Sequence, residues 1–329
     1  MPKNETDFLS ESRINLLRAK GKSVVKDKSK TCYIGQTAKD LRDKIVEKHY
    51  NAICDTFEIP KNDLELFKQA TEGSGNEWME INQLNSSTLL AFLCFHNVSQ
   101  KQKFKFDGDE YSEVYFEVQS PLKPRDGKAT APSNMDVVLL TEDHKKALFL
   151  ESKFTEYLSS KKPEVSTYYS RPYEALFGKD LTIECRTENG DDLSFSIKDS
   201  KWVPTNRQKR GQGLYLEGLK QMVSHYLGVL HCTQENDSEK FTGGASLWKV
   251  LSKVEEIQLG SILYRFENSK FDRYEAIYKK LMERIGDHSK KETKGRIKII
   301  KDILRYQDVF AESENKSLLD EKVSKFYFE

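Results

Sequence analysis

The chain has little cysteine, and what it has is scattered. Its five cysteines include no C-x-x-C pair, so zinc ribbons and thioredoxin-like redox motifs have no support. An odd number of thiols, one of them inside the apolar run LLAFLCF, is typical of buried free cysteines in a reducing compartment. The five are Cys32, Cys54, Cys94, Cys185 and Cys232.

Long hydrophobic runs are also missing. No stretch reaches the roughly 20 apolar residues that a bilayer-spanning helix requires. The opening residues, MPKNETDFLSES, lack the apolar core of a secretory signal. We therefore expect a soluble, cytoplasmic protein without membrane contact.

Nor does charge of one sign dominate. The 53 basic residues nearly cancel the 52 acidic ones, and a net charge of +1 gives no global electrostatic argument for nucleic-acid binding. A nucleic-acid surface would need basic residues gathered on one face. Four basic runs could supply phosphate contacts or could be ordinary solvated surface, and the first three precede expected core elements. They are residues 101–106, 121–128, 206–213 and 290–298.

Strand patterns occupy the middle of the chain. Val114, Phe116 and Val118 alternate like one face of a strand. Further strands are expected at 135–141, 146–154, 181–187, 193–199 and 254–266, with Asn189 and Gly190 at the turn of a hairpin.

Helical patterns surround these strands. Helices are expected at 38–70, at 211–231, at 271–286 and at 295–310. A further helix is expected from about Ser86, with Asn85 or Ser86 as its N-cap. The order predicts a mixed α/β core with a helical periphery. We predict a helical N-terminal extension (1–75), a core (76–268) and a helical C-terminal extension (269–329).

Two neighbouring apolar strands carry the residues that indicate a chemistry. Asp136 enters the first strand, and the second ends in Glu151, Ser152 and Lys153. The connection EDHK is short enough for an antiparallel hairpin. Since alternate strand residues share a face, Glu151 and Lys153 point the same way, and the hairpin sets Asp136 beside them.

Converging carboxylates repel one another unless a cation lies between them, and their oxygens suit Mg²⁺ or Mn²⁺. Such a metal polarises a phosphoryl oxygen and lowers the pKa of a bound water. Lys153 could then orient that water or offset charge on the phosphorus. The alternative interpretation is a solvated hairpin with a surface ion pair.

An acid followed, on the adjacent strand, by (D/E)-x-K resembles the PD-(D/E)XK nuclease superfamily. Asp136, in S-N-M-D, stands where that family has P-D, and Glu151-Ser152-Lys153 matches its second motif. The resemblance covers about residues 85–230. It implies a restriction-endonuclease-like fold with a mixed central sheet flanked by helices, dependence on Mg²⁺ (or Mn²⁺), and hydrolysis of phosphodiester bonds.

The same resemblance implies two further site residues. Related nucleases carry a glutamine on the helix after the core sheet, and Gln221 looks like that position, where it would support the metal ligands or position Lys153. Those families often continue Q-x-x-x-Y, whereas His225 is the fourth residue after Gln221 here. A third acid is usual upstream, and we favour Glu117 over its competitor Glu77.

Each of these residues also has a simpler interpretation. Gln221 could be a helix-surface amide, and Glu117 an outward polar position on a half-buried strand. His225 and His231 are expected to be core or surface histidines, because no metal-ligand spacing accompanies them. The tyrosine-rich stretch 166–178, which contains Arg171, is expected to pack a loop rather than to stack on bases.

We therefore predict a metal-dependent nuclease acting on DNA, in which Asp136 and Glu151, with Glu117, bind the metal and Lys153 assists the attacking water. One alternative is a non-catalytic nucleic-acid-binding or protein-interaction module on the same fold. Another is an unrelated α/β scaffold, which would place Asp136 and Glu151 on distant surfaces. The choice between DNA and RNA, the mode of cleavage and a homodimeric state are left open.

Overall fold

The computed structural model of the chain describes residues 38–72, 81–120, 133–158, 176, 180–187, 189–198, 201–204, 215–234, 253–311 and 313–329. Glu77, Arg171 and the basic runs 121–128 and 206–213 lie outside these residues. Its α-helices are α3 (Ala38–Phe57), α4 (Leu64–Ala70), α6 (Ser87–Phe95), α8 (Leu216–Gln234), α10 (Ser269–Thr293) and α11 (Glu321–Tyr327). Short single-turn helices are η2 (Glu156–Leu158), η5 (Gln307–Ala311) and η6 (Glu314–Leu318).

The strands form a large mixed sheet and a small antiparallel one. The large sheet has the order β1-β2-β3-β4-β8-β10, and β9 also pairs with β8, which makes seven strands within the described ranges. Its strands are β1 (Phe104–Phe106), β2 (Asp109–Ser120), β3 (Ser133–Thr141), β4 (Lys146–Lys153), β8 (Glu256–Leu263), β9 (Ile297–Ile299) and β10 (Leu304–Arg305). The small sheet is β5 (Asp180–Arg186), β6 (Asp192–Lys198) and β7 (Lys201–Pro204).

The pairing directions confirm the predicted mixed sheet. Strands β1 to β4 pair antiparallel in chain order, whereas β8 runs parallel to β4, β9 and β10. A parallel pair needs a long crossover, and the chain between β4 and β8 includes helix α8. The last residues of β4 and β8 therefore lie side by side at the same end of the sheet.

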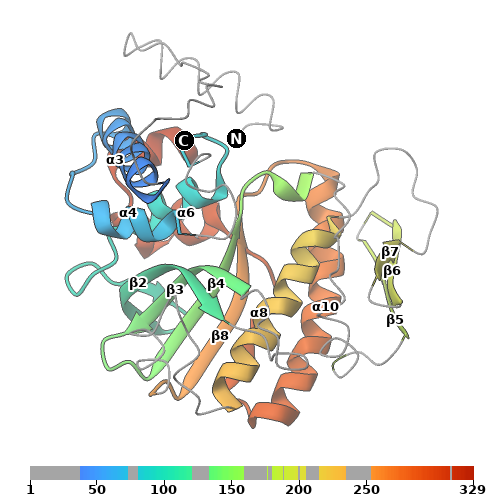
Figure 1. The fold of residues 1–329 in the computed structure, drawn as a ribbon. Coiled ribbons are helices and arrows are strands. Elements are labelled where there is room, and N and C mark those ends of the chain that lie inside the picture. Colours follow the sequence, from blue (N-terminus) through green and yellow to red (C-terminus); the bar gives the residue numbers. More distant parts are fainter. Residues whose placement is uncertain are drawn as a thin grey trace.

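Helices cover both faces of the large sheet (Figure 1). Helices α8 and α10 lie along one face, and α4 and α6 lie on the other together with the C-terminal segments. Helix α6 is buried all round, from Leu89 to Phe95, as its continuous apolar sequence predicts. The small sheet packs on α10, where Arg273 pairs with Asp191 at 3.2 Å.

The helix start before α6 is confirmed. Ser86 is the N-cap, and its hydroxyl accepts a hydrogen bond from the Leu89 N–H at 3.2 Å. The predicted β3–β4 hairpin and the β5–β6 hairpin are also confirmed. No helix in the described part of the chain is long and apolar enough to cross a membrane.

The helix predicted at 295–310 is wrong, because most of this segment forms β9, β10 and the short helix η5. Lys294 and Gly295 both have left-handed backbones, with φ values of 52° and 86°, and these end α10 before the segment begins. The following isoleucines are β-branched and suit a strand, and the open edge of β8 supplies their hydrogen-bond partners.

Candidate active site

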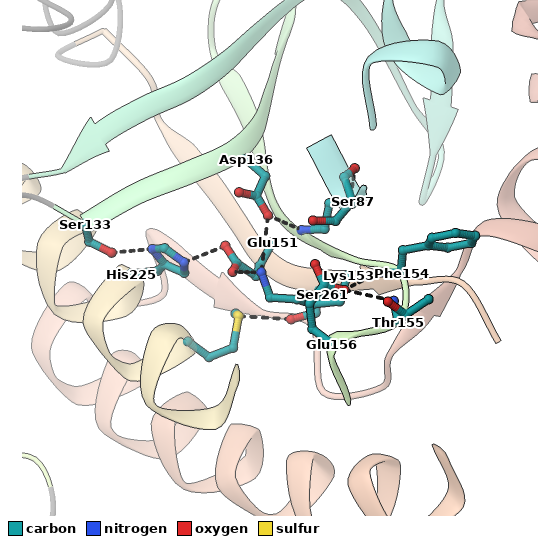
Figure 2. A network of polar contacts seen from close by, with 12 residues as sticks. Ser87, Ser133, Asp136, Glu151, Lys153, Phe154, Thr155, Glu156, His225 and Ser261 are labelled. Atoms are coloured by element: carbon teal, nitrogen blue, oxygen red, sulfur yellow. Dashed lines mark hydrogen bonds and ion pairs between the residues drawn. The ribbon is translucent and has the colours of Figure 1, made fainter. Parts of the chain in front are cut away.

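The β3–β4 hairpin places two carboxylates opposite each other. Val137 pairs with Leu150 across the hairpin, so Asp136 and Glu151 are the next opposed residues. Directly opposed residues in an antiparallel pair share a face, and Lys153, two residues beyond Glu151, shares it too. Figure 2 shows the three side chains converging at this end of the sheet.

The three charged groups are close and mostly buried. The Lys153 Nζ lies 2.5 Å from the Glu151 Oε1 and 3.7 Å from the Asp136 Oδ2. Glu151 is 2% exposed and Lys153 6% exposed, while the Asp136 side chain keeps 20% of its surface accessible. Asp136 also accepts a hydrogen bond from the Ser152 N–H at 2.7 Å. This arrangement is neither a solvated surface ion pair nor a pair of acids on distant surfaces.

The surroundings push the pKa values of the two acids apart. Burial, reinforced by the negative charge of Glu151, raises the pKa of Asp136 well above its ordinary value. Burial alone would also raise the pKa of Glu151, but the charges of Lys153 and His225 and their hydrogen bonds lower it to about 2. Burial opposes the charge on Lys153, yet Glu151 and Asp136 together raise the pKa of this ammonium well above its ordinary value.

A histidine that we did not predict as a site residue joins this cluster. The His225 Nε2 lies 2.6 Å from the Glu151 Oε2, and its Nδ1 contacts the hydroxyl of Ser133 at the start of β3. His225 is 3% exposed. We expected a core or surface histidine. The burial is that of a core residue, but the contact with Glu151 was not expected. One feature of the sequence could have indicated His225 as a site residue. It lies four residues after Gln221, and residues i and i+4 share a helix face.

An acid that we did not single out, Glu156, also lies near the site. Glu156, in η2, accepts hydrogen bonds from the N–H groups of Phe154 and Thr155 at 2.7 and 2.9 Å. Its charge helps to raise the pKa values of both Asp136 and Lys153. Figure 2 shows Glu156 beyond Lys153, on the side away from His225.

Glu117, the predicted third metal ligand, lies in β2 at the position that faces Asp136 across the ladder. The pairs on either side are in register, Phe116 with Val137 and Val118 with Met135. Glu117 itself is half-buried and has a left-handed backbone with φ of 50°, so the strand is irregular at this residue. Its role as a ligand stays a prediction.

Gln221 lies on α8 and differs from an ordinary surface amide. Its Oε1 is buried, and no hydrogen-bond partner for it occurs among the residues that the structure describes. Leaving such an acceptor unsatisfied costs about 1–3 kcal/mol. The role predicted for Gln221 at the site stays a prediction.

The chain matches a family of nucleases. The family model REase-ARP, described as "Restriction Endonuclease associating with ARP", matches residues 18–200, more than half of the chain. The chain belongs to the REase-ARP family. Membership implies a nuclease, and the restriction endonucleases that give the family its description imply a DNA substrate. No curated protein and no solved structure matches the chain.

The REase-ARP match covers part of the cluster. Asp136, Glu151, Lys153 and Glu117 all fall within the matched residues, whereas α8, with His225, follows them. The family match includes the β3–β4 hairpin but does not single out its residues, so their roles stay predictions. The contribution of α8 rests on the geometry alone.

The donor set suits a hard divalent cation only in part. Carboxylate oxygens are the ligands that Mg²⁺ prefers, and Asp136 and Glu151 supply them side by side. Both oxygens of Glu151 already contact Lys153 and His225. Within the described ranges, no three His, Cys, Asp or Glu side chains are arranged to hold a metal ion. A bound metal would thus have to share Glu151 with its present partners.

Both described basic runs lie far from the cluster. The run 101–106 enters β1, which lies at the Thr141 end of β3, and the run 290–298 enters β9 beside the start of β8. The cluster is at the other end of the sheet, seven strand residues or roughly 20 Å away. The run 101–106 precedes a core strand as expected, but that strand lies at the end of the sheet away from the cluster.

Proposed function

We propose that this REase-ARP protein is a Mg²⁺-dependent deoxyribonuclease whose centre is Asp136, Glu151 and Lys153. The observation that carries the proposal is the juxtaposition of two carboxylates and one ammonium, mostly buried, at the open end of a hairpin. Such an expensive arrangement is typical of a functional site rather than of a stabilising one. The family match supports the same conclusion from the sequence.

Each residue of the centre has a defined task in this proposal. Asp136 and Glu151 hold the metal, which when bound polarises the phosphate and activates water. Lys153 stays protonated, because its neighbours raise its pKa well above the ordinary value, and it therefore has no free lone pair with which to accept a proton. It therefore acts as a fixed positive charge that orients the water or offsets negative charge on the phosphate.

Three further residues are considered for roles around this centre. Glu117 faces Asp136 across the ladder, and we assign it as the third acid of the metal site. The buried Oε1 of Gln221 supports a role for this residue in accepting a hydrogen bond from the attacking water or from Lys153. Glu156 competes with Glu117, because its charge acts on both Asp136 and Lys153.

Cleavage assays on single variants test this proposal. Asp136→Asn and Lys153→Met should each lower Mg²⁺-dependent cleavage of DNA at least about 100-fold, because each removes a charge that acts in the transition state. Lys146→Met is the matched control. Lys146 starts the same strand and pairs with Asp109 at 2.6 Å, but it lies at the far end of the sheet.

The substrates should include circular DNA, linear DNA and an RNA of the same sequence, with and without EDTA. Cleavage of circular DNA would establish endonuclease action. Wild-type activity in Asp136→Asn or Lys153→Met would overturn the assignment of the site. Binding of DNA that is equally tight in EDTA, without any cleavage, would support the non-catalytic module instead.

A further inference from the structure

His225 is part of a chain of buried contacts that runs from β3 through α8 to β4. Ser133 contacts its Nδ1, and its Nε2 lies 2.6 Å from the Glu151 Oε2. Glu151 then contacts Lys153 through its other oxygen. All four residues are at least nine-tenths buried. Figure 2 shows the chain as a continuous line of dashed contacts from Ser133 to Lys153.

The direction of the central hydrogen bond follows from the partners. An ionised carboxylate only accepts hydrogen bonds, and the Lys153 ammonium at 2.5 Å favours the ionised form of Glu151. The His225 Nε2 must therefore carry the hydrogen and donate it to Glu151. The Ser133 hydroxyl at the Nδ1 holds the other side of the ring, so the ring cannot turn without losing a contact.

The two donors on Glu151 differ in stiffness. Lys153 is a long flexible side chain, and in the proposed function it has a second task at the phosphate. His225 is a planar ring on a packed helix, and α8 is fixed to the sheet one turn earlier, where the Met222 Sδ accepts a hydrogen bond from the Ser261 Oγ at 2.9 Å. Ser261 is the residue that pairs with Glu151 between β4 and β8.

We infer that His225 is a positioning residue that fixes the carboxylate of Glu151 in the orientation that binds the divalent metal. The inference rests on the proposed function, since it assigns a task within the same site. Without the Nε2–H donor, Glu151 would be free to rotate and to give both oxygens to Lys153. Metal binding would then have to break that pair and reorient the carboxylate.

Two amide variants separate positioning from simple packing. Gln places an N–H group near the position of the histidine Nε2, whereas Asn places its amide near the Nδ1. His225→Gln therefore keeps the donor to Glu151, and His225→Asn loses it. Both leave a polar side chain of reduced volume on α8, so a role in packing alone predicts similar effects for the two.

The primary measurement is calorimetric titration of Mn²⁺ into the full chain, followed by kinetics of DNA cleavage. Loss of a group that orients a metal ligand typically weakens metal binding roughly 10- to 100-fold, and we expect this for His225→Asn. We expect His225→Gln to stay within about threefold of the wild type. In cleavage, kcat should fall for His225→Asn while KM for DNA stays nearly unchanged.

The matched control is His96→Gln, because His96 is also buried between carboxylates but contacts Asp63 and Asp320. It should leave Mn²⁺ affinity unchanged. Equal losses in the Gln and Asn variants, or wild-type affinity in both, would overturn the inference. If Asp136→Asn abolishes Mn²⁺ binding while His225→Asn keeps wild-type affinity, only the role of His225 fails. Unchanged binding in Asp136→Asn, or none in the wild type, overturns the proposed function as well.

Discussion

At the scale of single residues, the proposed function of Asp136 requires a buried carboxylate that destabilises the metal-free protein. Its carboxylate is held opposite Glu151 with little solvent, and among the described residues the charge of Lys153 and the Ser152 N–H favour its ionised form. The raised pKa means that folding favours the protonated form of this residue. Without a metal, the ionised carboxylate therefore destabilises the folded protein.

Replacing Asp136 by Asn should thus stabilise the metal-free protein. The folded-state pKa of Asp136 is raised above 3.8, so its favourable contribution is present below that pH and is lost as pH rises through the folded-state pKa. Asn removes the charge and keeps an acceptor for Ser152. In EDTA, we expect a gain in unfolding free energy of at least about 1 kcal/mol at neutral pH, which shrinks in acid. Urea unfolding at several pH values measures it, and a loss of stability would contradict this account.

The same residues show what the sequence reveals about a site. The juxtaposition of Asp136, Glu151 and Lys153 is predictable because strand alternation and a short turn are local rules, and the hairpin obeys them. The contact of His225 with Glu151 depends on how α8 docks on the sheet, and no local rule gives that. Glu156 is missed for a similar reason, since its effect comes from the turn of η2 back toward Lys153.

At the scale of elements, one histidine joins three helices. His96 ends α6, and its ring lies 3.1 Å from Asp63 and 3.0 Å from Asp320. These aspartates are the N-cap residues of α4 and α11, yet neither makes a side-chain capping bond. Their carboxylates face His96 instead, so the same ion pairs tie the N-terminal helices to the C-terminal one.

This arrangement should make stability depend on pH. Burial alone would lower the pKa of His96, but the Asp320 and Asp63 carboxylates more than offset it and raise the pKa above 6.5. The contribution to stability is therefore fully present below 6.5 and lost as pH rises through the folded-state pKa. We expect the unfolding free energy of the wild type to fall, relative to that of His96→Phe, as the pH rises above 6.5. Parallel curves for the two proteins would contradict this prediction.

Most helices and strands could be predicted from the sequence, and the wrong prediction of a helix at 295–310 has a physical cause. The capped helix after Ser86 and the two hairpins carry local signals that the structure confirms. The strands β9 and β10 carry spacing that also suits a helix, with apolar residues close together in RIKIIKDIL. What decides between the two is the unpaired edge of β8, a partner about 40 residues away in sequence.

At the scale of the whole molecule, the C-terminal residues complete the large sheet. Both β9 and β10 pair with β8, and α10 covers the same face as α8 (Figure 1). Tyr327 of α11 reaches into the core, where its carbonyl accepts a hydrogen bond from Tyr264 and its hydroxyl donates to the Leu84 carbonyl at 3.2 Å. The predicted division into 1–75, 76–268 and 269–329 stays a prediction, but these contacts cross its second boundary.

A chain that ends after Asn268 should therefore fail to fold. It would lack the buried face of α10, and the edge of β8 would lose the partners that β9 and β10 supply. An open apolar edge favours association over folding, so we expect aggregation and no cooperative unfolding transition. Circular dichroism and urea unfolding of the purified fragment measure this, with the full chain as control. If the fragment unfolds cooperatively and cleaves DNA, residues 269–329 are a dispensable addition and the predicted boundary is right. If it does not, the nuclease centre depends on a sheet that closes only when the C-terminal strands reach β8.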